Sequence, residues 1–152
     1  MWFDGVRQTN WETQMTRPAV SLDLKDARQL IAAGERKAIE MKIPYNLAVV
    51  DAGGGLVAHV RMDGAWLGSV DIAINKAWTA RAFDMPTDDL SHFAQSGQQG
   101  FGLNTTNDSR VVIFGGGIPI KRAGAVIGGC RGERRQCAAG RRGRTGSRRR
   151  VA

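Results

Sequence analysis

The sequence predicts an α+β domain with a five-stranded antiparallel sheet and helices packed on it, in the order α-β-β-α-α-β-β-β. Two segments, at about 24–41 and 69–83, have apolar residues at helical spacing, and short runs of β-forming residues lie between and after them. Glycine-rich links join these runs, and links this short require neighbouring strands to be antiparallel. We expect the helices to cover one side of the sheet.

The first helix follows Asp23, whose carboxylate suits the capping position. Pro44 ends it, because the residue before a proline is pushed out of the helical region. Its apolar face and its charged opposite face predict an amphipathic helix that docks on the sheet. The apolar face consists of Ala27, Leu30, Ile31, Gly34, Ala38 and Met41.

A β-hairpin comes next, with strands at Tyr45–Asp51 and Leu56–Met62 joined by Ala-Gly-Gly-Gly. In the second strand His59 and Arg61 alternate away from the face that carries Val60.

The second half begins with a helix capped by Ser69 that runs to about Phe83, then a short helix at Asp88–Gln95 and a loop at Ser96–Ser109. Three strands are expected after the loop, at Arg110–Phe114, Ile118–Lys121 and Ala125–Gly129.

Charged residues are distributed unevenly along the chain. Residues 1–129 carry thirteen Lys/Arg and thirteen Asp/Glu, whereas residues 130–152 carry nine Arg and one Glu. We therefore expect a flexible leader at 1–18, with Met15 as an alternative start, a charge-balanced domain at 19–129, and an Arg-rich, disordered tail at 130–152. The tail has no interleaved aromatic residue and no recognition motif, so no specific nucleic-acid binding is expected. No apolar stretch reaches the roughly 20 residues that span a bilayer, and a cytoplasmic location is expected.

Three segments, VVDAGGGLVAHVRMDGAW, IAINKAWTARAF and VVIFGGGIPI, occur in an order and spacing that resemble the GlcG/HbpS-like heme-binding, heme-degrading family. That family is related to the C-terminal domain of PduO-type corrinoid adenosyltransferases. The resemblance covers residues 19–129 and implies a profilin-like fold, a small-molecule ligand, heme as the cofactor, a link to heme degradation, and a homo-oligomer. Two alternatives stay open: an enzyme or accessory protein for a small carboxylated metabolite of a glycolate or diol pathway, and a basic nucleic-acid-binding protein if the tail is genuine.

Family members continue with a strand end resembling VGVSGG and a helix resembling QDVEVA. Residues 130–145 can be written in codons whose reading, one base displaced, is VGVSGGSARQDVEVAR. The sequence therefore predicts a frameshift near Gly128-Gly129 that removes the end of the last strand and the closing C-terminal helix.

The candidate ligand site is cationic. Arg61 and Lys76 could hold the carboxylates of a ligand, with Asp63 beside them. The alternative is a structural ion-pair network that anchors the helix to the sheet. Asn104, in a loop, could line the same pocket.

Gly115 and Gly116 lie in a glycine cluster that matches no phosphate-loop pattern, so it reads as a turn that also lets a ligand approach the backbone.

Two histidines are the candidates for a metal ligand, His59 on a strand and His92 on a short helix. Lone histidines are more often structural. Family members often have histidine where this chain has Gly55, and the first helix has none, so both departures weigh against histidine-ligated heme.

Overall fold

A computed structural model describes residues 20–131 of the protein. Helices and strands follow one another as α2 (Leu24–Met41), β1 (Asn46–Val50), β2 (Leu56–Arg61), α3 (Ser69–Ala82), α4 (Thr87–Phe93), two short 3-10 turns, η1 (Leu103–Thr105) and η2 (Asn107–Ser109), then β3 (Gly117–Arg122) and β4 (Ala125–Arg131). None of the helices within residues 20–131 has the length and hydropathy needed to cross a membrane.

Helix α2 begins where the sequence predicts. The Asp23 carboxylate accepts a 2.7 Å hydrogen bond from the amide of Asp26, which satisfies one of the free donors of the first turn. The helix ends at Lys42, whose left-handed conformation (φ 55°) turns the chain just before Pro44.

The sheet is antiparallel and has the strand order β2-β1-β4-β3. Strand β1 pairs with β2 along its whole length, from Asn46 opposite Arg61 onward. Within residues 20–131 it pairs with β4 at Val49 and Val50, which lie opposite Cys130 and Gly129. All five residues of β1 are buried, so this strand is the centre of the fold.

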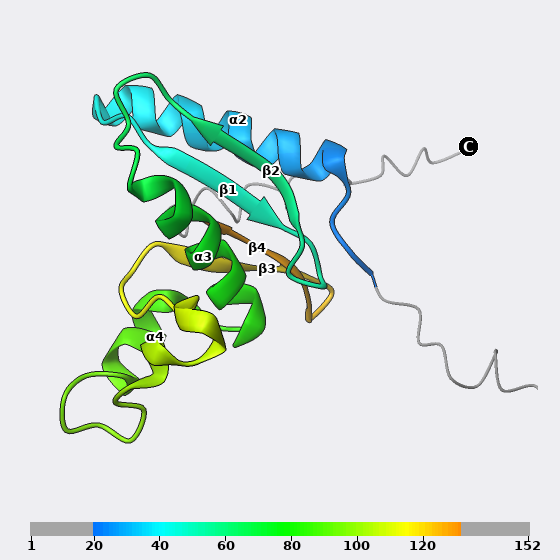
Figure 1. Ribbon diagram of the computed structural model, residues 1–152. Coiled ribbons are helices and arrows are strands. Elements are labelled where there is room, and N and C mark those ends of the chain that lie inside the picture. Colours follow the sequence, from blue (N-terminus) through cyan, green and yellow to red (C-terminus); the bar gives the residue numbers. More distant parts are fainter. Residues whose placement is uncertain (1–19, 132–152) are drawn as a thin grey trace, which may run out of the picture.

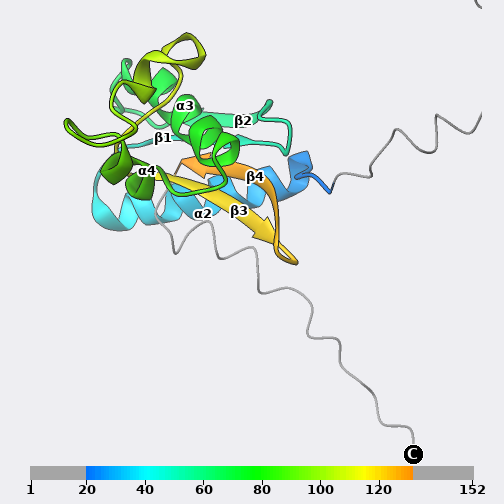
Figure 2. The same cartoon turned by 90° about the horizontal axis from the view of Figure 1, so that it is seen from below.

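Helices cover both faces of the sheet, and the expectation that they cover one side was wrong (Figures 1 and 2). Leu47 and Val49 of β1 pack in the core that includes Ala27 and Ile31 of α2. Ala48 and Val50, which point the other way, pack against α3. A strand buried on both sides has apolar residues at successive positions, as NLAVV does, and that pattern favours two covering layers.

The strand expected at Arg110–Phe114 does not form, and the described residues make a four-stranded rather than a five-stranded sheet, in the order α-β-β-α-α-β-β. The hydroxyl of Thr79, in α3, donates to the carbonyl of Arg110 at 3.3 Å and accepts from the amide of Val112 at 3.1 Å. These backbone groups are thus satisfied by a helix side chain instead of a neighbouring strand.

The last strand runs to Arg131, two residues beyond the expected Gly129. The expected leader at 1–18, the rest of the Arg-rich segment and the position of the expected closing helix fall on residues outside the described range 20–131.

Candidate functional site

Lys76 lies in the middle of α3 and is 4% exposed. Its Nζ donates a 2.7 Å hydrogen bond to the carbonyl oxygen of Gly115 and lies 3.9 Å from the centroid of the Phe114 ring. A Cβ placed on Gly116 would lie 3.4 Å from the same nitrogen. The structure therefore brings together three of the predicted site residues, Lys76, Gly115 and Gly116.

The Gly115–Gly117 turn is wedged between α3 and α4. The amide of Gly117 donates a 2.8 Å hydrogen bond to the Thr87 hydroxyl in the first turn of α4. A Cβ on Gly117 would collide with the backbone carbonyl of Lys76, and Gly116 has a φ of 116°, which favours glycine. The glycine cluster is therefore a tight packing turn, but it does not join two strands as expected, because the strand before it does not form.

Two cations face this region without a carboxylate partner. Burial, followed by the positive charge of Arg131, lowers the pKa of Lys76 to about 8. Arg131 lies over the ring of Tyr45, 4.2 Å from its centroid. Burial lowers the pKa of Arg131 as well, against the opposing effect of Tyr45. No salt bridge to either cation is present within residues 20–131.

The other polar candidates lie elsewhere. Arg61 is the last residue of β2, and Arg61 and Asp63 are both exposed. Neither forms a salt bridge in the part of the chain that the structure describes, and Lys76 bonds to Gly115 instead of joining them. The anchoring ion-pair network considered for these residues is therefore absent. Asn104 lies exposed in η1.

The two histidines differ in access. His59 lies opposite Ala48, so it faces the α3 side of the sheet. Its Nε2 is buried without a hydrogen-bond partner, and burial lowers its pKa. His92 lies exposed in the last turn of α4. A neutral imidazole is the form that binds iron. Nε2 of His59 is covered, whereas His92 is exposed.

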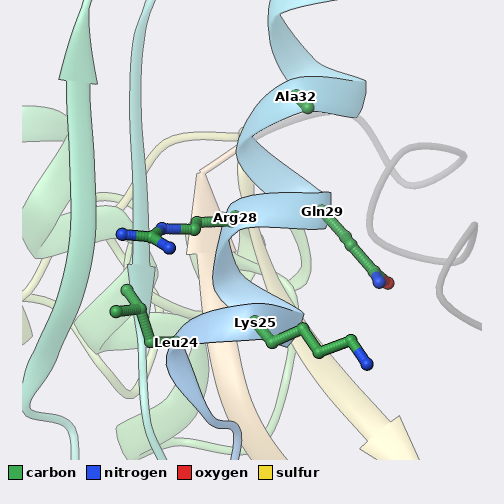
Figure 3. A pocket seen from close by; sticks show the side chains of 5 residues that line it. All are labelled: Leu24, Lys25, Arg28, Gln29 and Ala32. Carbon is green, nitrogen blue, oxygen red and sulfur yellow. The ribbon is translucent and has the colours of Figure 1, made fainter.

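An open hollow of about 530 Å³ lies along α2, on the opposite face of the sheet from Lys76. Leu24 and Arg28 point to one side of the helix, and Lys25 and Gln29 to the other (Figure 3). Ala32 completes the lining. None of the candidate residues lines this hollow, and the candidate site is the region around the buried Lys76 on the α3 side.

Sequence reasoning missed three residues at the site: Asn46, Phe114 and Arg131. The signal for Asn46 was a polar residue at the start of a strand that is otherwise apolar, NLAVV. Its amide donates to the carbonyl of Trp66 at 3.0 Å and to the Ser69 hydroxyl at 3.1 Å, which fixes the loop before α3. Phe114 and Arg131 gave no such signal, because their roles arise only from the way α3 crosses the sheet.

The model of a protein family described as "Haem degrading protein HbpS-like" matches residues 22–131, which is nearly all of the described chain. The chain belongs to the HbpS-like family. Its α+β fold and its likeness to the PduO C-terminal domain, both expected from the sequence motifs, are confirmed.

Two relatives of this HbpS-like chain come from Citrobacter freundii. The 15.0 kDa protein encoded in the dhaT-dhaS intergenic region is 41% identical over 108 residues, which are 71% of this chain and 76% of that protein. The corrinoid adenosyltransferase PduO is 38% identical over 118 residues, 77% of this chain. The chain spans only 35% of PduO.

Two solved structures share the fold. The Klebsiella pneumoniae protein ORFY has a TM-score of 0.75 and 36% identity, covering 82% of this chain and 88% of that one. The heme complex of PduOC has a TM-score of 0.71 and 35% identity, covering 80% of this chain and 90% of that one.

Proposed function

We propose that this HbpS-like chain is a cytoplasmic protein that binds heme or a closely related tetrapyrrole. The observation that carries the proposal is the likeness to the PduOC heme complex, at 35% identity over 80% of the chain. The family match over residues 22–131 includes α3, α4 and the glycine turn.

The described residues fit such a ligand. Heme presents a flat apolar ring, two carboxylates and an iron atom that takes axial protein ligands. Phe93 and Phe114 expose aromatic surface at the end of α4 and at the glycine turn, and the hydrogen bond from Gly117 to Thr87 holds that turn against α4. His92 lies next to Phe93 and is exposed.

In this arrangement Phe93 and Phe114 would contact the ring, and His92 would supply an imidazole to the iron. Lys76 would provide a cation for the carboxylates, beside the backbone of Gly115 and Gly116. Arg61, Asp63 and Asn104 lie elsewhere and take no part in this arrangement. His59 suits the iron less well, because its Nε2 is covered. Bound heme would supply the redox chemistry, and the chain would bind it and limit its exposure to water.

Titration with hemin, followed by visible absorption, tests the proposal. We expect the main absorption band of hemin to shift and sharpen as a one-to-one complex forms. His92→Ala should change the position of the band, whereas His59→Ala, the matched control, should leave it unchanged. The absence of any spectral change with the intact chain would refute heme binding; an unchanged band in His92→Ala would reject only this iron ligand.

A further proposal is that the protein degrades the heme that it binds, and this rests on the family description alone. Adding a reductant and oxygen to the loaded protein should then bleach the heme band and release iron faster than in free hemin. Equal rates of bleaching with the protein and with free hemin would show that the protein binds heme without degrading it.

A second candidate is the binding of a small carboxylated metabolite, and the buried cation favours it. Nζ of Lys76 has three donors, of which one is used at Gly115. Calorimetric titration with glycolate, against neutral glycolamide as the control, should then show saturable heat for glycolate alone. The nucleic-acid alternative depends on residues 132–152, outside the described range.

A homo-oligomer is also proposed. The loop before α3 presents Trp66 and Leu67, which are 83% and 75% exposed. The carbonyl of Trp66 accepts hydrogen bonds from Asn46 and Ser69, so the backbone beneath these apolar side chains is held in place. Light scattering should give more than one chain mass, and Trp66→Ser should lower it; a monomeric parent protein would contradict this.

A further inference from the structure

The ammonium group of Lys76 has more hydrogen-bond donors than its surroundings use. The residue is 4% exposed, and its Nζ lies at the glycine turn, beside the exposed Gly115 and Phe114. An ammonium has three N–H donors. Within residues 20–131 Nζ makes one hydrogen bond, 2.7 Å to the Gly115 carbonyl, and lies 3.9 Å from the centroid of the Phe114 ring. A cationic nitrogen with a single N–H would keep both contacts and leave no donor without an acceptor.

Space for a small molecule lies on one side of this nitrogen, next to Gly116. A Cβ built on Gly116 would have Nζ of Lys76 at 3.4 Å and Cδ at 3.7 Å, with no other described atom beyond the neighbouring glycines within 4 Å. The lack of a side chain at Gly116 therefore leaves Nζ open from this direction. Phe114, which covers Nζ from another direction, is a surface side chain with 51% exposure, so its rotation would not disturb the core.

The charges around Lys76 favour the neutral amine. Burial, followed by the positive charge of Arg131 on β4, lowers the pKa of Lys76 to about 8. On the α4 side, Oδ1 of Asp88 lies 3.1 Å from the Cβ position of Gly115, but no salt bridge joins Asp88 to Lys76 within residues 20–131. Relative to an ordinary lysine with a pKa of 10.5, the neutral amine is about 300-fold more abundant at pH 7.

We propose that Lys76 is a reactive amine that binds small aldehydes covalently, as a protonated imine. Lysines become nucleophilic in desolvated sites or beside a second cation, and both conditions hold for Lys76. The protonated imine has one N–H, which would donate to the Gly115 carbonyl, and its positive charge would face the Phe114 ring. An aldehyde also fits because it is compact and uncharged, and needs no counter-ion from the protein.

The reaction begins when the neutral amine of Lys76 attacks the carbonyl carbon of the aldehyde. The N–C bond forms as the π electrons of the carbonyl group move to its oxygen, and a proton passes from nitrogen to that oxygen to give a carbinolamine. The hydroxyl group then leaves as water with a proton from the solvent, while the nitrogen lone pair forms the C=N bond. Nothing is oxidised or reduced in these steps, and water is the only product besides the imine.

Trapping with propanal and sodium cyanoborohydride tests the proposal on the intact chain. Cyanoborohydride reduces the imine to a stable propyl-lysine, which mass spectrometry of the peptides locates. At pH 7 we expect Lys76 to be tagged at least about tenfold faster than Lys25, an exposed lysine of α2, because restricted access offsets only part of the gain in neutral amine. Tagging of Lys76 at the same rate as Lys25, or more slowly, would overturn the proposal.

Two controls separate a folded site from general lysine reactivity. In urea, where the fold is lost, Lys76 and Lys25 should be tagged at the same rate. An excess at Lys76 that persists in urea would come from the local sequence and would refute the folded site. Lys76→Met should remove the fast phase of tagging while the other lysines react as before. A fast phase that survives in this variant would place the reactive amine elsewhere and reject the assignment to Lys76.

Discussion

Lys76 Nζ and the carbonyl oxygen of Gly115, 39 residues further along the chain, are joined by a 2.7 Å hydrogen bond. The backbone of Lys76 also meets the turn, since its carbonyl leaves no room for a Cβ on Gly117. Lys76 thus fixes both ends of the glycine turn. The position of this turn then determines where Phe114 and β3 lie.

Replacing Lys76 with methionine removes the charge but keeps a long apolar side chain. Loss of the hydrogen bond lowers the free energy of unfolding by about 1.5–3 kcal/mol, whereas removal of the buried charge raises it by a similar amount. Gly115 is exposed, so water can satisfy its carbonyl. We therefore expect Lys76→Met to change the free energy of unfolding at pH 7 by less than about 1 kcal/mol.

Loss of the hydrogen bond between Lys76 and Gly115 should instead loosen the glycine turn locally. Amide hydrogen exchange at Gly117 should accelerate in Lys76→Met, and the exposed-lysine control Lys25→Met should leave it unchanged. A large global destabilisation would show that the hydrogen bond outweighs the burial cost.

The pH dependence of stability gives a second prediction. Burial lowers the pKa of Lys76 from 10.5 to about 8, so between these values the folded state holds fewer protons than the unfolded state. Stability relative to Lys76→Met should therefore rise between pH 8 and pH 10.5, by roughly 1–3 kcal/mol, and stay constant below pH 8. Urea unfolding of both proteins at intervals from pH 7 to pH 10.5 measures it. If the free energy of unfolding changes with pH in the same way in both proteins, the lowered pKa of Lys76 is contradicted.

Gly117 should not tolerate a side chain. A Cβ there would collide with the carbonyl of Lys76 and lie 2.6 Å from Cγ2 of Thr87. Because backbone cannot move aside without shifting α3, we expect Gly117→Ala to cost about 3 kcal/mol or more in the free energy of unfolding. Gly68→Ala is the matched control, since no atom lies within 4 Å of its Cβ position and its φ is −63°. Similar unfolding midpoints for the two variants would show that the turn adapts.

Local signals in the sequence predicted the elements that depend on near neighbours. The Asp23 cap and the stop before Pro44 set the limits of α2, and the glycines after Asp51 gave the β1–β2 hairpin. In that hairpin the Asp51 carboxylate accepts from the amides of Gly53 and Gly55, at 2.9 and 2.8 Å, so its structure is encoded within five residues.

Long-range contacts could not be predicted in the same way. The run RVVIF has the composition of a strand, yet the carbonyl of Arg110 and the amide of Val112 are bonded by Thr79, about thirty residues earlier. The same holds for the hydrogen bond from Lys76 to Gly115, which takes the place of the ion-pair network considered as one alternative for Lys76, Arg61 and Asp63. A lysine in an amphipathic pattern indicates a solvated face unless the path of the helix across the sheet is known.

Thr79 gives the last prediction, because its hydroxyl bonds to two backbone groups of the segment before the glycine turn. Thr79→Val keeps the shape but leaves the carbonyl of Arg110 and the amide of Val112 without their partner. We expect a loss of about 1–3 kcal/mol in the free energy of unfolding, together with faster amide exchange at Val112. Thr79→Ser keeps the hydroxyl and loses one buried methyl group, so it should cost roughly 0.8 kcal/mol and leave the Val112 amide protected. If the Val112 amide exchanges equally fast in both variants, the segment is held by packing rather than by this hydroxyl.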